Sequence, residues 1–429
     1  MNIYFKHIIL NITLFSMCGM AFPQEQAMRL TLKEAQDYAL KHNRTVWNAN
    51  LTVTETQKRT WEAISAGLPQ VSAGVSYQNM MGFKMSFAGI NIAMVPTSNF
   101  QATVSQLLFN GSYWVGIKMS KIGEEMSETA RLQTELDVKQ QTQSAYHAVL
   151  IAEENKTILE QNLNNIQALA QSTDDLVRVG VAEQTDADRM KVQVAAMMNG
   201  IKTVERHIEL AYNLLRFHLG VDTDAEIVLT QSLNDLLAAK NVQEMLRSDF
   251  NLHTNYTMQL VDYQIDLADK QISLAKAAAL PTVAAFYSYT YKIARSTFDM
   301  SPNNVIGMQA NIPIFASGQR HVQSQQAKIN LEKAQNNRDL LIDQLLMQEK
   351  QLRFNLNNAV ESFDLQKEAV DVSQRVFESV SRKFQQGTAS SLDVTIASSD
   401  LLQAQTNYIN AMMQVFAAQT ELEKLFNTL

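Results

Sequence analysis

The side chains best placed to do chemistry are two aspartates, each a few residues beyond a glycine in a helix-rich region. Asp186 follows Gly180 and Thr185, and Asp393 follows Gly387. A carboxylate near a helix start is stabilised by the helix dipole, and Thr185 or Asp186 could cap the helix that follows. At both positions a structural role at a helix start and a functional role remain open.

Other catalytic or ligand-binding patterns are missing from the sequence. The single cysteine, Cys18, lies in an apolar N-terminal segment, so the chain after it offers no thiol chemistry and no disulfide. No nucleotide-binding motif or phosphate loop occurs. The histidines after the N-terminal segment show no pairing at ligand spacing: they are His42, His147, His207, His218, His253 and His321. The sequence therefore predicts neither an enzyme nor a cofactor or metal site.

Composition narrows the class of protein further. The 429 residues include 46% hydrophobic residues, which is ample for a core, and the net charge is −7. Lysine and arginine are not clustered, as they would be in a nucleic-acid-binding protein, so no nucleic acid is expected as a partner.

Residues 1–21 are expected to form a secretory signal peptide. Lys6 precedes an apolar run over 8–20, and residues 19–21 fit a cleavage site with small residues. A lipoprotein signal at Cys18 is the alternative, although the bulky Met17 stands where such signals have a small residue. No later run of about 18 apolar residues follows, so no helix after residue 21 is expected to cross a membrane.

Glycine and proline positions outline long helical hairpins. Residues 319–386 contain neither, and at ~1.5 Å per residue such a helix would be roughly 100 Å long. A second run without either residue follows Gly387. The region 124–179 and the run after Gly180 repeat this arrangement. Glycine adopts positive φ easily, so Gly180 and Gly387 are predicted to form the hairpin tips.

The hydrophobic period changes from helical to two-residue in two regions, which predicts a β-hairpin over 69–109 and another over 281–315. Each strand has an apolar face that alternates with polar residues. Those faces are Val71, Ala73, Val75 and Tyr77; Phe100, Ala102 and Val104; Val283, Ala285, Tyr287, Tyr289 and Tyr291; and Ile306, Met308, Ala310 and Ile312. Helices are expected before them, over 28–66 and 254–280.

Corresponding features recur at a nearly constant offset. Phe315 follows Phe109 by 206 positions, and Gly387 follows Gly180 by 207. One shared order at one period indicates an internal duplication. The expected organisation is a first repeat over 22–220, a linker over 221–249 and a second repeat over 250–429. Each repeat has a helix, a β-hairpin and a helical hairpin.

Four amphipathic strands are too few to close a barrel, because even small barrels need about eight. An open sheet in lipid would leave unpaired edges, which is costly. The consistent solution is an oligomer that pools strands into one barrel, with the polar faces lining a water-filled lumen. Those faces include Gln70, Ser72, Gln101, Thr103 and Gln309.

Several short motifs, taken together in this order, resemble the TolC-type outer-membrane efflux protein family. They are Ser105-Gln106-Leu107-Leu108-Phe109-Asn110-Gly111, Val179-Gly180-Val181 with Thr185-Asp186, and Phe384-Gln385-Gln386-Gly387-Thr388 with Leu392-Asp393-Val394. The resemblance implies a mainly helical fold with a β-barrel contribution. It also implies a homotrimer with a twelve-stranded barrel in outer-membrane lipid and an α-helical barrel across the periplasm. The implied partners are a periplasmic adaptor protein and an inner-membrane transporter.

The resemblance also implies roles for residues near the tips. Asp393 matches an acidic ring at the pore constriction, while Ile396 stands where the family has a second acid. Asp186 matches an acid that latches the closed tip, but its expected partners are replaced by Ala389 and Phe384. The residues expected at the periplasmic tip and in adaptor docking are Val179, Gly180, Val181, Thr185, Gln386, Gly387, Thr388 and Leu392.

The predicted function is a passive outer-membrane exit duct for efflux or type I secretion, with the transported substrate not readable from the sequence. Two alternatives remain: a periplasmic coiled-coil adaptor and a structural spacer of the envelope.

Overall fold

The computed structural model describes residues 27–429 except 88, 240–241 and 296–298. The expected signal peptide, with Cys18, lies outside the described residues. The chain divides into two compact units, and its longest helices contribute to both. We name them the tip unit (residues up to 43, 141–242 and 359–417) and the sheet unit (44–140, 243–358 and 418–429). The prediction of a mainly helical chain with a small β contribution is confirmed.

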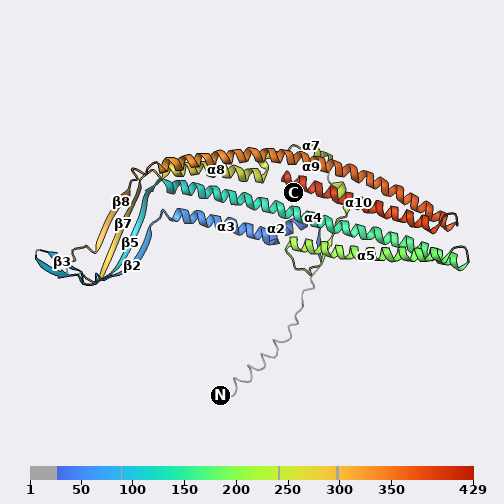
Figure 1. Cartoon of the computed structure of the whole chain (residues 1–429), viewed down its shortest axis with the longest axis horizontal. Coiled ribbons are helices and arrows are strands. Elements are labelled where there is room, and N and C mark those ends of the chain that lie inside the picture. The colour runs from blue at the N-terminus through green and yellow to red at the C-terminus, as the bar shows by residue number, and fades with distance from the viewer. Residues whose placement is uncertain (1–26, 88, 240–241, 296–298) are drawn as a thin grey trace, which may run out of the picture. The chain divides into compact units, whose positions relative to one another are not determined.

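The sheet unit contains an antiparallel sheet in the order β2-β5-β7-β8, whose strands lie side by side in Figure 1. The strands are β2 (Gln70–Gln78), β5 (Thr97–Asn110), β7 (Thr282–Ala294) and β8 (Asn304–Asn311). Between β2 and β5, the short strands β3 (Lys84–Phe87) and β4 (Ile90–Ala93) pair with each other. The helices of the unit are α3 (Arg44–Ser65), α7 (Val242–Arg247), η1 (Leu252–Thr254), α8 (Tyr256–Ala277), and parts of α4 (Gly111–Arg178), α9 (Gln319–Gln385) and α10 (Ser391–Leu425).

The register aligns the apolar faces of all four strands on one side of the sheet. Val71 is opposite Val104, Val104 is opposite Tyr287, and Tyr287 is opposite Ile306. These side chains are not covered within the chain: Val71 is 74% exposed and Ile306 is 84% exposed. Because β5 pairs with β7, the two hairpins form one surface, and β2 and β8 are left as the edges of the sheet.

The opposite face of the sheet is polar and hydrogen-bonded across strands. The Gln101 side chain donates to the Ser288 hydroxyl at 2.7 Å. On the same face, the Phe286 ring lies over Gly307, where a Cβ atom would come within 2.7 Å of the ring. The glycine therefore makes room for an aromatic side chain of the neighbouring strand.

The tip unit is built from paired helices. In Figure 1, α4 lies beside α5 (Gln184–Leu219), and α9 lies beside α10 (Ser391–Leu425). The unit also contains α2 (Leu32–His42), α6 (Leu233–Ala239) and a parallel pair formed by β1 (Met28–Leu30) and β6 (Ile227–Leu229).

The prediction of one helix over 28–66 is wrong. Residues 28–30 form β1, and a capping box between Thr31 and Glu34 begins α2. A break at Asn43 then separates α2 from α3, and the Asn43 side chain donates to the His218 carbonyl oxygen at 2.8 Å. A three-residue strand and a local side-chain contact are both too short to change the hydrophobic period that the prediction used.

The predicted start of the first long helix is also wrong. The sequence indicated residue 124, whereas α4 begins at Gly111. Gly116 and Gly123 lie inside the helix, and each would have open space around an added Cβ. A glycine weakens a helix by about 1 kcal/mol relative to alanine, which packing elsewhere along so long a helix can offset.

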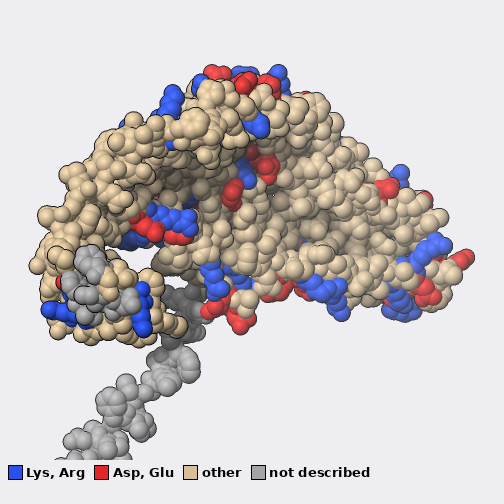
Figure 2. Space-filling model, turned by 60° about the vertical axis from the view of Figure 1, so that its left-hand side comes forward, with Lys and Arg blue, Asp and Glu red and all other residues tan. Residues whose placement is uncertain are grey.

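Charged side chains are mixed over the surface. Figure 2 shows lysine and arginine next to aspartate and glutamate, with broad uncharged areas between them. Within the described part of the chain, no helix combines the length and the apolar character needed to span a bilayer.

Candidate functional site: the helical tips

The two tips end their first helices in the same way. Gly180 has φ of +77° and Gly387 has φ of +73°. At the first tip the Val181 amide donates to the Leu176 carbonyl, and at the second the Thr388 amide donates to the Lys383 carbonyl, both at 2.9 Å. This is the Schellman arrangement, in which a left-handed glycine lets the last carbonyls of a helix find donors.

At the second tip, Asp393 completes a capping box with Ser390, the residue before α10. The Asp393 carboxylate accepts from the Ser390 amide at 2.9 Å and from its hydroxyl at 2.8 Å, while the Asp393 amide donates to that hydroxyl at 3.2 Å. These bonds, led by the one from the Ser390 backbone, lower the pKa of Asp393 below its ordinary 3.8. The carboxylate is exposed and caps the helix.

At the first tip, Asp186 occupies the corresponding position after Glu183. One of its carboxylate oxygens accepts from the Glu183 amide at 3.3 Å. Thr185, which the sequence offered as a possible cap, instead donates its hydroxyl to the Glu183 carboxylate at 3.2 Å.

The second oxygen of Asp186 joins the two helical hairpins. It accepts a hydrogen bond from the hydroxyl of Ser391, the first residue of α10, which is only 1% exposed. Sequence reasoning missed Ser391, because a serine at a helix start is explained well enough by capping. Its partner lies 205 residues away in the chain, which no local pattern could show.

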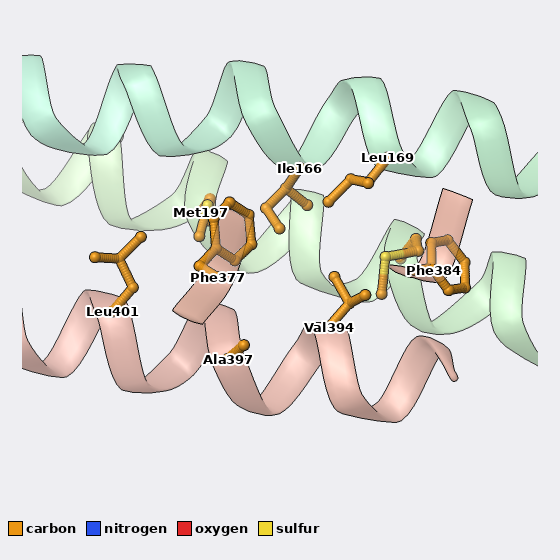
Figure 3. Close-up of a cluster of buried hydrophobic side chains, with 9 residues drawn as sticks. Ile166, Leu169, Met197, Phe377, Phe384, Val394, Ala397 and Leu401 are labelled. Atoms are coloured by element: carbon orange, nitrogen blue, oxygen red, sulfur yellow. The ribbon is translucent and has the colours of Figure 1, made fainter. Parts of the chain in front are cut away.

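Below this contact, a hydrophobic cluster holds the four long helices α4, α5, α9 and α10 together (Figure 3). It consists of Ile166 and Leu169 from α4, Met190 and Met197 from α5, Phe377 and Phe384 from α9, and Val394, Ala397 and Leu401 from α10. Phe384 and Ala389 stand where the resemblance expects partners for Asp186. The Phe384 ring is buried in this cluster, and Ala389 packs against it.

The remaining predicted tip residues form an exposed surface. Val179 and Val181 are 71% and 68% exposed, and Leu392 and Ile396 are each about half exposed. Thr185, Gln386 and Thr388 are also exposed. The tip surface therefore combines apolar side chains with backbone turns fixed by glycine, which suits docking of another protein better than it suits catalysis.

Within the described ranges, no group of three or more His, Cys, Asp or Glu side chains could hold a metal ion. Surface ion pairs such as Lys191–Asp174, at 3.1 Å, join neighbouring helices of the tip unit. Exposed pairs of this kind contribute little to stability.

The fold is that of solved outer-membrane channels. VceC from Vibrio cholerae superimposes with a TM-score of 0.72 at 16% identity, covering 92% of this chain and 95% of VceC. The open-state MtrE channel of Neisseria gonorrhoeae gives a TM-score of 0.74 at 16% identity, covering 92% of this chain and 88% of MtrE.

The family model described as outer membrane efflux protein matches residues 36–221 and 251–428, and the chain belongs to this family of outer-membrane efflux channels. Among its relatives, outer membrane protein TolC of Salmonella enteritidis is 23% identical over 378 residues, which are 86% of this chain and 76% of TolC. BepC of Brucella suis biovar 1, an outer membrane efflux protein, is 21% identical over 415 residues, which are 94% of this chain and 87% of BepC.

Proposed function

We propose that this chain is the outer-membrane exit duct of a tripartite efflux or type I secretion system and conducts substrates passively. The observation that carries the proposal is the four-stranded sheet, whose continuous apolar face is exposed and whose edges β2 and β8 are unpaired. Such a sheet in lipid needs partner strands at both edges, because an unsatisfied backbone group in hydrocarbon costs several kcal/mol.

Copies of the chain can supply those partners. If β8 of one copy pairs with β2 of the next, three copies close a twelve-stranded barrel with the polar face toward the lumen. The homotrimer is supported by family membership and by the two free edges together. The two segments matched by the family model support the internal duplication.

The long helices would then form the periplasmic part of the duct. Helix α4 has 68 residues and α9 has 67. At ~1.5 Å per residue, each would be roughly 100 Å long. The proposed partner at the tips is a periplasmic adaptor, which docks on the exposed surface that includes Val179, Val181 and Leu392, and an inner-membrane transporter supplies the energy.

In this duct, three copies of Asp393 would form an acidic constriction with Ile396 on the same exposed side of α10. Asp186 would act differently, because both of its oxygens are already engaged within one chain. We expect it to hold the two hairpins of a subunit together.

Single-channel recording in planar bilayers tests the duct. The purified oligomer should conduct, and Asp393→Asn should weaken block by multivalent cations. A correctly folded oligomer that never conducts, even when its tips are opened by mutation, refutes the duct and favours an adaptor or a structural spacer. Unchanged cation block in Asp393→Asn removes that residue from the pore lining. Cross-linking in the envelope, followed by co-purification, would identify the adaptor and transporter.

A further inference from the structure

The paired ladder of β7 and β8 ends at Tyr289 and Asn304. The register places Tyr289 opposite Asn304, and the Thr290 amide donates to the Asn303 carbonyl at 2.7 Å. Continued further, this register would bring Ser301 opposite Lys292. Instead, the Lys292 ammonium donates to the Ser301 carbonyl oxygen at 2.5 Å. The contact between Lys292 and Ser301 is therefore made by the lysine side chain. We call residues 299–303 the return segment.

The contacts between the return segment and Lys292 are made on the polar face. Side chains alternate along a strand, so Lys292 shares a face with Ser288 and Thr290. Ser288 accepts the cross-strand hydrogen bond from Gln101 on that same face. The Lys292 ammonium thus meets the return segment on the polar side of the sheet and not on the apolar side.

An ion pair holds the return segment in place. The Lys292 ammonium lies 2.6 Å from one Asp299 carboxylate oxygen, and the two side chains are only 8% and 18% exposed. The other Asp299 oxygen accepts from the Ser301 amide at 3.0 Å and from its hydroxyl at 2.5 Å. We name Lys292, Asp299 and Ser301 the clasp.

The charges and hydrogen bonds of the clasp keep it formed. Hydrogen bonds from Lys292 and then Ser301 lower the pKa of Asp299 to about 2, so this carboxylate stays ionised near neutral pH. Removal of one partner leaves a shielded charge without its counter-charge, which is strongly unfavourable. With both charges present the clasp is neutral overall, so its effect on solutes should depend on their size more than on their charge.

We propose that the clasp fixes the return segment as a restriction on the polar side of the sheet, and that Lys292, Asp299 and Ser301 thereby set the largest solute that passes the β7–β8 loop. The proposal rests on the function proposed above, in which the polar face lines an aqueous lumen. It adds a size-determining element that is separate from the helical tips.

Polymer exclusion in planar bilayers tests the restriction on the full-length channel. Single-channel conductance is recorded with polyethylene glycols of increasing size added on the side of the β7–β8 loop. We expect Lys292→Met to raise the conductance and the size of the smallest excluded polymer, and Asp299→Asn to do so less, because it keeps the contacts with Ser301. Lys84→Met, which removes an exposed positive charge from β3, should match wild type.

The outcomes separate the two proposals. A conducting wild type with unchanged exclusion in both clasp variants overturns the restriction alone. A wild type that never conducts overturns the duct and, with it, the role in solute size. Hydrogen exchange of amides 299–303 tests the clasp without conduction: faster exchange in Lys292→Met supports it, and equal exchange overturns it.

Discussion

Replacing Ser391 by alanine should loosen the attachment of one helical hairpin to the other. The Ser391 hydroxyl donates to a carboxylate oxygen of Asp186, and Ser391 is almost completely buried while Asp186 is half-buried. Hydrogen bonds to charged groups contribute about 1.5–3 kcal/mol. Since Asp186 remains partly solvated, we expect the lower figure, about 1.5 kcal/mol, which corresponds to roughly a tenfold larger population of open tips.

Hydrogen exchange of peptides covering 179–190 and 384–396 measures this opening, and a double-mutant cycle with Asp186→Ala isolates the pair. Both single variants should speed exchange, and the double variant should exchange no faster than the worse single one. Ser399→Ala is the matched control, because Ser399 is exposed on the same helix and alanine favours helix. A coupling energy near zero, or equal effects at Ser391 and Ser399, would refute the role of this contact.

Four further perturbations test the rest of the tip unit. Phe384→Ala should destabilise it by about 3–5 kcal/mol, since a large side chain is removed from a buried cluster; local hydrogen exchange or limited proteolysis would report this. Gly387→Ala should destabilise the tip unit by only about 1–2 kcal/mol, because the positive φ is the one source of strain and an added Cβ would meet no neighbour. Gly220→Ala should destabilise the tip unit more than Gly387→Ala does, because its Cβ would also lie 2.5 Å from a main-chain carbonyl oxygen of α2. Thermal unfolding would measure the difference. The depressed pKa of Asp393 means that its capping box stabilises the tip above pH 3.8 and that this contribution is lost as pH falls through the folded-state pKa. Exchange at 390–394, corrected for intrinsic rates, should rise in acid, and Asp393→Asn should abolish that dependence.

Elements with a strong period or a required backbone conformation could be predicted from the sequence. Alternation at Val71–Tyr77 and Val283–Tyr291 predicts strands, and β2 and β7 occupy those positions. Gly180 and Gly387 were expected at the tips on account of positive φ, and both have it. These features depend on a few neighbouring residues, which is why a single sequence displays them.

Features that depend on distant residues could not be predicted. The pairing of β5 with β7 joins hairpins from the two halves of the chain, and neither strand encodes the choice of partner. The contact between Asp186 and Ser391 is similar, since each residue is already explained locally as a helix-start residue. For Asp393, the structure shows the hydrogen bonds of a helix-start residue, which the sequence had offered as one interpretation, and its pore role stays a prediction.

The two tips share one backbone turn, but their aspartates differ in the hydrogen bonds that a substitution would remove. Both bonds that Asp393 accepts from Ser390 fall on one oxygen, whereas Asp186 uses one oxygen for its own helix and the other for Ser391. Substitution at 393 thus affects one helix end, and substitution at 186 affects a helix end and a connection between hairpins. A change at position 393 therefore leaves the connection between the hairpins in place, whereas a change at position 186 deprives the buried Ser391 hydroxyl of its acceptor.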